Sequence, residues 1–214
     1  MTWQVDYALQ NLEKAGLDFI ATYHGGEAIL IKKVGKPDVV AAISEARVID
    51  RDVVASYLER VPDMDFLCGY RNECVWHGDA IKLLKENKIG WGNYSTLESA
   101  ALRGNANVAS HKTFAFSDRL LRQTTTVVKG LDREYDRVYH VVIKSGRKLR
   151  LGMLSEYEPT ADVLRTFWDE FGEIDVAWNI NPNGNPTKDA IEAGKELGCE
   201  VLKWDDLKAY MQKA

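Results

Sequence analysis

Cysteine and histidine side chains are the first candidates for chemistry, because two cysteines and one histidine fall in the short segment "CGYRNECVWH". These are Cys68, Cys74 and His77. A structural zinc site takes four ligands and usually begins with a CxxC-type pair, which this segment lacks. The third cysteine is Cys199, and an odd, sparse set does not indicate a disulfide framework. We therefore predict buried thiols and no metal site at these positions.

Basic side chains are concentrated in one stretch of an otherwise acidic chain. Residues 101–150 contain 11 Lys or Arg and 4 Asp or Glu, a net charge of +7, whereas the whole chain carries −4. Such a block can form an anion-binding face, and it can equally be a solvated surface that balances the acidic remainder. The candidate anion contacts are Arg119, Arg122, Lys144, Arg147, Lys148 and Arg150.

Composition is that of an ordinary globular protein, with 45% hydrophobic and 28% charged residues over 214 positions. No apolar run approaches the roughly 20 residues of a membrane span. The N-terminal "MTWQVDYALQ" lacks the basic and apolar regions of a secretion signal. We expect a cytoplasmic protein without membrane segments.

The chain resembles itself when it is shifted by 110 residues. Identities align without a gap and the apolar pattern agrees throughout, which indicates a tandem duplication of one small domain. Five of the identical pairs are Asp65/Asp175, Asp79/Asp189, Ala80/Ala190, Ile81/Ile191 and Lys85/Lys195. We predict two domains, residues 1–104 and 105–214, with a joint in the polar, Gly- and Asn-bearing segment 103–112.

Each predicted copy has the same sequence of elements. Val- and Ile-rich runs around turn residues predict β-hairpins over 28–44 and 138–155, and helical periodicity follows over 50–61 and 160–171. Short apolar runs at 65–70 and 175–180 predict central strands. Second helices (78–88, 187–198), short strands (89–91, 199–204) and last helices around Leu97 and Leu207 follow. The leading helices are expected over 3–16 and 116–130, with an extra strand over 17–23.

Helix ends have recognisable residues in both copies. Asp50 and Thr160 stand where a short oxygen-bearing side chain can cap a helix N-terminus. Pro186 and Thr187 suit the start of the helix that Gly198 ends. The preceding loop "NINPNGNPT" lacks the GxxxxGK[ST] spacing of a P-loop, so we expect an ordinary strand-to-helix turn there.

This order of elements resembles the restriction-endonuclease-like, or PD-(D/E)XK, superfamily. The closing pattern of copy two is particularly similar to it: an apolar strand, an Asn-Pro-Asn-Gly loop, "TKDAIEAGKELG", a short strand and "WDDLKAYM". The resemblance covers most of both copies. It implies an α/β protein with two tandem mixed-sheet domains of αβββαβαβα order.

The resemblance also implies a divalent-metal site, most often for Mg²⁺, held by an Asp and a Glu from adjacent strands of a hairpin. In copy two these are Asp136 and Glu156, with Glu158 where the family has Lys. Copy one offers Glu27 with Glu45, and Arg47 in the Lys position, which is a poor substitution. A second alignment of copy one uses Asp18 and Lys33, with Ile31 in the Glu position. Neither copy carries the complete signature.

Three functions follow as expectations. The first is a nucleic-acid-associated protein, either a metal-dependent nuclease or a degenerate relative, whose basic segment contacts phosphates. The second is a non-catalytic scaffold for a protein partner, with Trp76 and Tyr70 as exposed anchors. The third is a nucleotide or small-ligand binder that uses the strand-end loops at 69–78 and 179–188.

Overall fold

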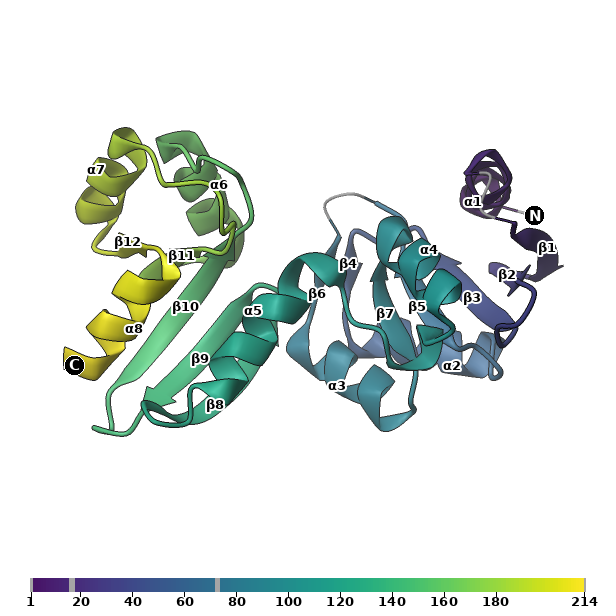
Figure 1. The fold of residues 1–214 in the computed structure, drawn as a ribbon, viewed down its shortest axis with the longest axis horizontal. Coiled ribbons are helices and arrows are strands. Elements are labelled where there is room, and N and C mark those ends of the chain that lie inside the picture. The colour runs from purple at the N-terminus through teal and green to yellow at the C-terminus, as the bar shows by residue number, and fades with distance from the viewer. Residues whose placement is uncertain (1, 16–17, 72–73, 214) are drawn as a thin grey trace. The chain divides into compact units, whose positions relative to one another are not determined.

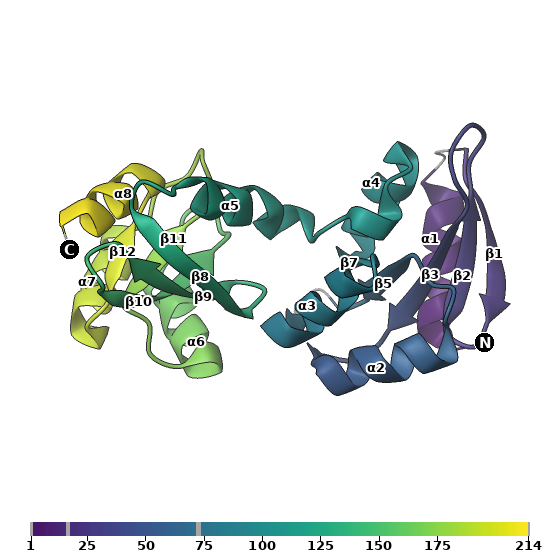
Figure 2. The same ribbon diagram turned by 90° about the horizontal axis from the view of Figure 1, so that it is seen from below.

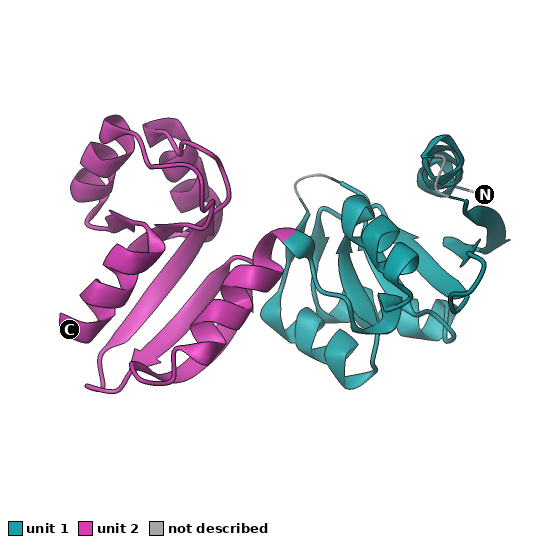
Figure 3. Cartoon of the chain, in the orientation of Figure 1, with its two compact units in different colours: residues 1–112 teal, residues 113–214 magenta. Residues whose placement is uncertain are grey.

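The computed structural model describes residues 2–15, 18–71 and 74–213. It divides into two compact units, unit 1 (Met1–Lys112) and unit 2 (Thr113–Ala214), coloured separately in Figure 3. Each unit has one five-stranded mixed sheet with helices against it. The predicted joint, 103–112, comprises the end of helix α4, the short helix η1 and the start of helix α5.

Unit 1 is built on the sheet order β1-β2-β3-β5-β7. Strands β1 to β3 are antiparallel, and β3, β5 and β7 are parallel. Two short strands, β4 and β6, form a separate parallel pair. The elements, labelled in Figure 1, are α1 (Trp3–Lys14), β1 (Ile20–Gly25), β2 (Ala28–Lys32), β3 (Val39–Ser44), β4 (Val48–Ile49), α2 (Arg51–Arg60), β5 (Phe66–Gly69), β6 (Val75–Trp76), α3 (Gly78–Glu86), β7 (Gly90–Asn93), α4 (Tyr94–Arg103) and η1 (Ala106–Val108).

Unit 2 repeats this topology with the sheet order β12-β11-β10-β9-β8. Strands β8 to β10 are antiparallel, and β10 to β12 are parallel. Its elements are α5 (Lys112–Gln123), β8 (Val128–Tyr135), β9 (Val138–Ile143), β10 (Lys148–Leu154), α6 (Ala161–Phe171), β11 (Val176–Asn179), α7 (Lys188–Leu197), β12 (Glu200–Leu202) and α8 (Trp204–Lys213).

The sheet of unit 1 buries both faces. Because neighbouring residues of a strand point to opposite faces, β3 sends Ala41 and Ile43 to one core and Val40 and Ala42 to the other. Helices α1 and α4 cover the first face and α2 and α3 the second, as Figure 2 shows. In unit 2 the core under α5 and α8 includes Tyr139, Leu151 and Trp178 among its buried side chains. The predicted α/β fold with two mixed sheets is therefore confirmed.

The predicted helix ends are confirmed as well. The side chains of Asp50 and Thr160 accept hydrogen bonds from the backbone N–H groups of Val53 and Val163, as N-cap residues do. Thr187 caps α7 in the same way, and Gly198 ends that helix in the left-handed conformation, where a Cβ would cost energy.

Two local predictions were wrong. The leading helix of copy two was expected over 116–130, but α5 ends at Gln123 and strand β8 begins at Val128. Trp76 was expected on an exposed loop, but it lies in β6 and is fully buried, because β6 pairs with β4 beneath helices α2 and α3. Trp76 therefore cannot serve as a surface anchor.

No helix in the described part of the chain is both long and apolar enough to cross a membrane. The three cysteines are buried, as predicted, and none of them is in a disulfide. Burial raises the pKa of the Cys199 thiol to about 11 and that of the Cys68 thiol further. Both therefore stay protonated near neutral pH.

Candidate functional site: a cationic and aromatic cleft in unit 1

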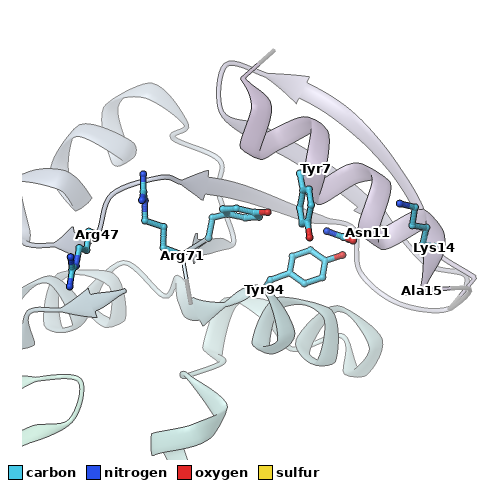
Figure 4. Close-up of a pocket in the computed structure, with 8 residues that line it drawn as sticks. Tyr7, Asn11, Lys14, Ala15, Arg47, Arg71 and Tyr94 are labelled. Atoms are coloured by element: carbon cyan, nitrogen blue, oxygen red, sulfur yellow. The ribbon is translucent and has the colours of Figure 1, made fainter. Parts of the chain in front are cut away.

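A cleft of about 790 Å³ lies in unit 1 (Figure 4). Its volume is in the range of small-molecule and cofactor sites. Three tyrosines, three cationic side chains and two smaller residues line it: Tyr7, Tyr70, Tyr94, Lys14, Arg47, Arg71, Asn11 and Ala15. No acidic side chain is among these described lining residues.

The parallel strands bring one side of this cleft together. Arg47 follows β3, Tyr70 and Arg71 follow β5, and Tyr94 follows β7 as the first residue of α4. Since β3, β5 and β7 are parallel, their carboxyl ends meet at one edge of the sheet. Ligands of open α/β sheets commonly bind beyond this edge.

Helix α1 supplies the other side. Tyr7, Asn11 and Lys14 recur at the i, i+4 and i+7 spacing that places side chains on one helix face. Val5, Ala8 and Leu12 are buried and fix α1 on the sheet. In Figure 4, Tyr7 and Asn11 point from α1 toward Tyr94 on α4.

Tyr7 and Tyr70 contact each other, and Tyr70 and Tyr94 remain protonated. The rings of Tyr7 and Tyr70 meet edge-on, with 5.4 Å between their centroids, and the Tyr94 hydroxyl donates to the Ala8 carbonyl at 3.5 Å. Burial, helped by the neighbouring Tyr7 hydroxyl, raises the pKa of Tyr70 to about 12. Burial and the charge of Glu98 raise the pKa of Tyr94 as well. Both hydroxyls therefore stay protonated at physiological pH, and the Tyr94 proton is the one donated to the Ala8 carbonyl.

The cations are positioned at the strand ends and at the end of α1. The Nε of Arg71 donates to the Glu45 carbonyl at 2.7 Å, which ties the loop after β5 to the loop after β3. Lys14 is exposed in the last turn of α1. Such groups can bind phosphate or carboxylate oxygens.

The matching edge of unit 2 has different chemistry. The pair β10 and β11 in unit 2 corresponds to the pair β3 and β5 in unit 1. With their registers aligned, Arg47 corresponds to Tyr157 and Arg71 corresponds to Asn181. The buried stripe Phe114, Ser117, Leu121 of α5 matches Val5, Ala8, Leu12 of α1, so Lys14 corresponds to Gln123. None of the three cations that line the unit 1 cleft has a cation at the corresponding position of unit 2. The shared topology alone therefore does not produce the cationic lining of the cleft.

The predicted metal site of unit 2 contains an arginine. Asp136 is 0% exposed, in the turn between β8 and β9, and both its carboxylate oxygens accept from Arg137: Nε–Oδ1 is 2.8 Å and Nη2–Oδ2 is 2.9 Å. The Arg137 guanidinium lies over the rings of Phe114 and Phe171, at 5.1 and 5.6 Å from their centroids. Burial opposes its charge, yet Asp136 and, more weakly, Glu170 and Glu156 raise the pKa of Arg137.

Asp136 and Glu156, as arranged, do not fit a divalent metal ion, because the guanidinium already neutralises Asp136 through both oxygens. A metal role for these two carboxylates stays a prediction that would require the Asp136–Arg137 pair to open. Glu156 and Glu158 lie exposed in the loop after β10. Among the residues that the structure describes, no three His, Cys, Asp or Glu side chains are grouped to hold a metal.

The carboxylates predicted in unit 1 have other contacts. Glu27, at the turn before β2, forms an ion pair with Arg60 of α2. Glu45 is exposed after β3, and its carbonyl accepts from Arg71. Asp18 is exposed with a left-handed backbone, and Lys33 lies over the Phe19 ring.

The predicted basic segment is partly neutralised within unit 2. Arg122 pairs with Asp118 at 3.0 Å, and Arg150 pairs with Glu134 at 2.7 Å and also donates to the Phe171 carbonyl. The guanidinium of Arg147 lies over the Tyr210 ring, and that of Arg119 over Phe116. Lys144 and Lys148 are exposed around the β9–β10 turn.

The hairpin separates the basic turn from the predicted metal site. Lys144 and Lys148 lie where β9 ends and β10 begins, while Asp136 precedes β9 and Glu156 follows β10. At about 3.4 Å per residue, six strand residues put the two ends of β9 about 20 Å apart. The sheet does not bring these two sets of residues together.

Sequence reasoning pointed to part of the cleft. The loop 69–78, proposed for ligand binding because it follows a central strand, contains Tyr70 and Arg71. Its residues 72 and 73 lie outside the described part of the chain. The contributions of Tyr7, Asn11, Lys14 and Tyr94 were missed, and only the i, i+4, i+7 spacing on α1 could have drawn attention to the first three.

Comparisons with protein-family models, with curated proteins and with solved structures found no match to this chain. The chemistry of the cleft is therefore the basis on which a function can be assigned.

Proposed function

We propose that the protein binds nucleic acid through the unit 1 cleft, without hydrolysing it. The observation that supports the proposal is the lining of three tyrosines and three cations with no acidic side chain among the described residues. Lysine and arginine bind phosphates and aromatic rings stack on bases, so both parts of a nucleotide have a complementary group here.

The positive lining is a local feature of an acidic unit. Residues 1–112 contain 13 Lys or Arg and 15 Asp or Glu, a net charge of −2. A cleft that gathers three cations on such a background favours an anionic ligand, because the local potential governs encounter and affinity.

In this proposal the protein is a degenerate relative of restriction-endonuclease-like proteins. The αβββαβαβα order of unit 2, which unit 1 shares apart from the added short strands β4 and β6, supports the kinship. Unit 2 is non-catalytic, because Arg137 engages both oxygens of Asp136. Mg²⁺ has no role in the proposed activity.

The test is fluorescence anisotropy with labelled DNA and RNA oligonucleotides at several salt concentrations. The variant Lys14→Gln/Arg47→Gln removes two cleft cations and should reduce the slope of log K against log salt by about 1.4 for a single strand, from two lost phosphate contacts. The matched control, Lys144→Gln/Lys148→Gln, removes two exposed cations of unit 2 and should leave binding unchanged.

Two results would contradict the proposal. One is absence of binding at low salt, and the other is a loss confined to the Lys144→Gln/Lys148→Gln control, which would transfer binding to the β9–β10 turn. Oligonucleotides incubated with Mg²⁺ or Mn²⁺ should stay intact, and metal-dependent cleavage would contradict the non-catalytic assignment.

A protein-binding scaffold is the second candidate function. The observation that favours it is the exposure of Trp3 and Tyr7 on α1, since exposed aromatic residues often anchor interfaces. A salt-insensitive complex with one protein, together with no affinity for nucleic acid, would select this function.

A further inference from the structure

We infer that the unit 1 cleft takes unpaired nucleic acid, with a base stacked on the exposed aromatic rings of α1. This inference rests on the proposed function and specifies its ligand. Trp3 is 57% exposed and Tyr7 is 49% exposed, one helical turn apart. Residues four apart lie on the same helix face, so the Trp3 ring lies on the face of α1 from which Tyr7 lines the cleft.

Tyr70 holds both rings in place. Its ring is nearly perpendicular to each, with centroid distances of 5.2 Å to Trp3 and 5.4 Å to Tyr7. These edge contacts leave each of the two α1 rings about half exposed. A preorganised ring costs less conformational entropy on binding than a mobile one, so these rings are suited to stacking.

The cations lie within reach of the same strand. Tyr7 and Lys14 both line the cleft from one face of α1, two turns apart, and Arg47 and Arg71 line it from the strand ends. In Figure 4 the labelled cations Lys14, Arg71 and Arg47 extend along the cleft on either side of Tyr7 and Tyr94. A strand with a base on Tyr7 can therefore place neighbouring phosphates against cations.

A duplex does not offer the groups that this site recognises. In a duplex the base faces are covered by neighbouring base pairs, and sequence is read by elements that protrude into a groove. The cleft is concave and its aromatic residues need an open base face, which unpaired strands supply. The expected ligand class is single-stranded DNA or RNA.

The experiment compares one 12-nucleotide strand with a duplex of the same sequence, by anisotropy at fixed salt. The single strand should bind at least tenfold more tightly. Trp3→Ala and Tyr7→Ala should each weaken single-strand binding by about 5- to 150-fold, the range of one lost base-aromatic stack. Tyr7→Phe should bind nearly as the wild type does.

Phe116→Ala is the matched control, because Phe116 is 57% exposed on α5 at the position that corresponds to Tyr7. It should leave binding unchanged. Circular dichroism should show that all variants fold.

The outcomes separate this inference from the function on which it rests. If neither strand nor duplex binds, the proposed function fails. If the duplex binds as tightly as the strand, and Lys14→Gln/Arg47→Gln weakens it while Tyr7→Ala does not, nucleic-acid binding stands and the single-strand inference is overturned. An equal loss in Phe116→Ala and Tyr7→Ala would also overturn it.

Discussion

Replacement of Arg137 by methionine should strongly destabilise unit 2. Arg137 is the partner that the structure gives to both oxygens of the fully buried Asp136. Methionine can keep the apolar contacts with Phe114 and Phe171 but leaves a buried carboxylate without its cation. Removing one member of a buried pair costs about 3–5 kcal/mol, and the 21% exposure of the Arg137 side chain indicates the lower end, about 3 kcal/mol.

Thermal unfolding followed by circular dichroism measures this loss. For a unit of about 100 residues, 3 kcal/mol corresponds to a fall in Tm of about 12–24 °C. The double variant Asp136→Asn/Arg137→Met also removes the unpaired carboxylate, so it should recover much of the stability that Arg137→Met loses. Arg119→Met removes an exposed arginine that lies over Phe116 and should cost less than about 1 kcal/mol. The reasoning is refuted if Arg137→Met and Arg119→Met unfold at the same temperature.

Divalent cations extend the same experiment. If the guanidinium holds the place predicted for a metal, Mn²⁺ or Mg²⁺ should raise the Tm of Arg137→Met and leave the wild type unchanged, because a ligand stabilises only the state it binds. A similar rise for the wild-type protein would restore the predicted metal role of Asp136 and Glu156.

Two further predictions concern single polar groups, one partly buried and one fully buried. Burial opposes the charge of Asp118, but the hydrogen bond from Arg122 and the charge of Arg133 lower the pKa of Asp118 below its usual value. The ionised Asp118 therefore stabilises the folded state fully above about pH 4, and this stabilisation is lost as pH falls through the lowered pKa. Asp118→Asn should lower the free energy of unfolding by about 1–2 kcal/mol at pH 7 and by progressively less in acid. Urea titrations at several pH values measure this difference. Gln4 on α1 is 1% exposed, and its amide has no hydrogen-bond partner among the described residues. Gln4→Leu should therefore raise the unfolding free energy of unit 1 by about 1 kcal/mol. A fall in Tm for this variant would show that the amide of Gln4 is hydrogen-bonded in the folded protein.

Most of the fold could be predicted because its signals are local. The hairpins and the caps at Asp50 and Thr160 are visible in short windows of sequence, and the agreement of such windows 110 residues apart revealed the repeat. Strand β8 was missed because "VKGLDREY" is an edge strand with mixed burial, so it lacks the clean alternation of a half-buried strand. Trp76 was misassigned because its burial depends on pairing with Val48 and Ile49, which lie far away in sequence.

The cleft was harder to predict because its residues form no motif. Tyr7 and Tyr94 are separated by 86 intervening positions, and only the packing of α1 and α4 on one face of the sheet brings them together. The charge block drew attention to residues 101–150, where several arginines turned out to pair with acidic neighbours such as Asp118 and Glu134. A surplus of one charge along a sequence does not reveal which charges are neutralised by folding.

The described lining residues of the cleft all fall between positions 7 and 94, within unit 1. Two units of the same topology in one chain provide an internal reference, because unit 1 has the cations of the cleft and unit 2 has other side chains at the corresponding positions. Exchanging side chains between corresponding positions, Arg47 with Tyr157 or Arg71 with Asn181, would move the cationic groups from unit 1 to unit 2 on the same backbone topology. Such variants would separate the contribution of the fold from that of the side chains.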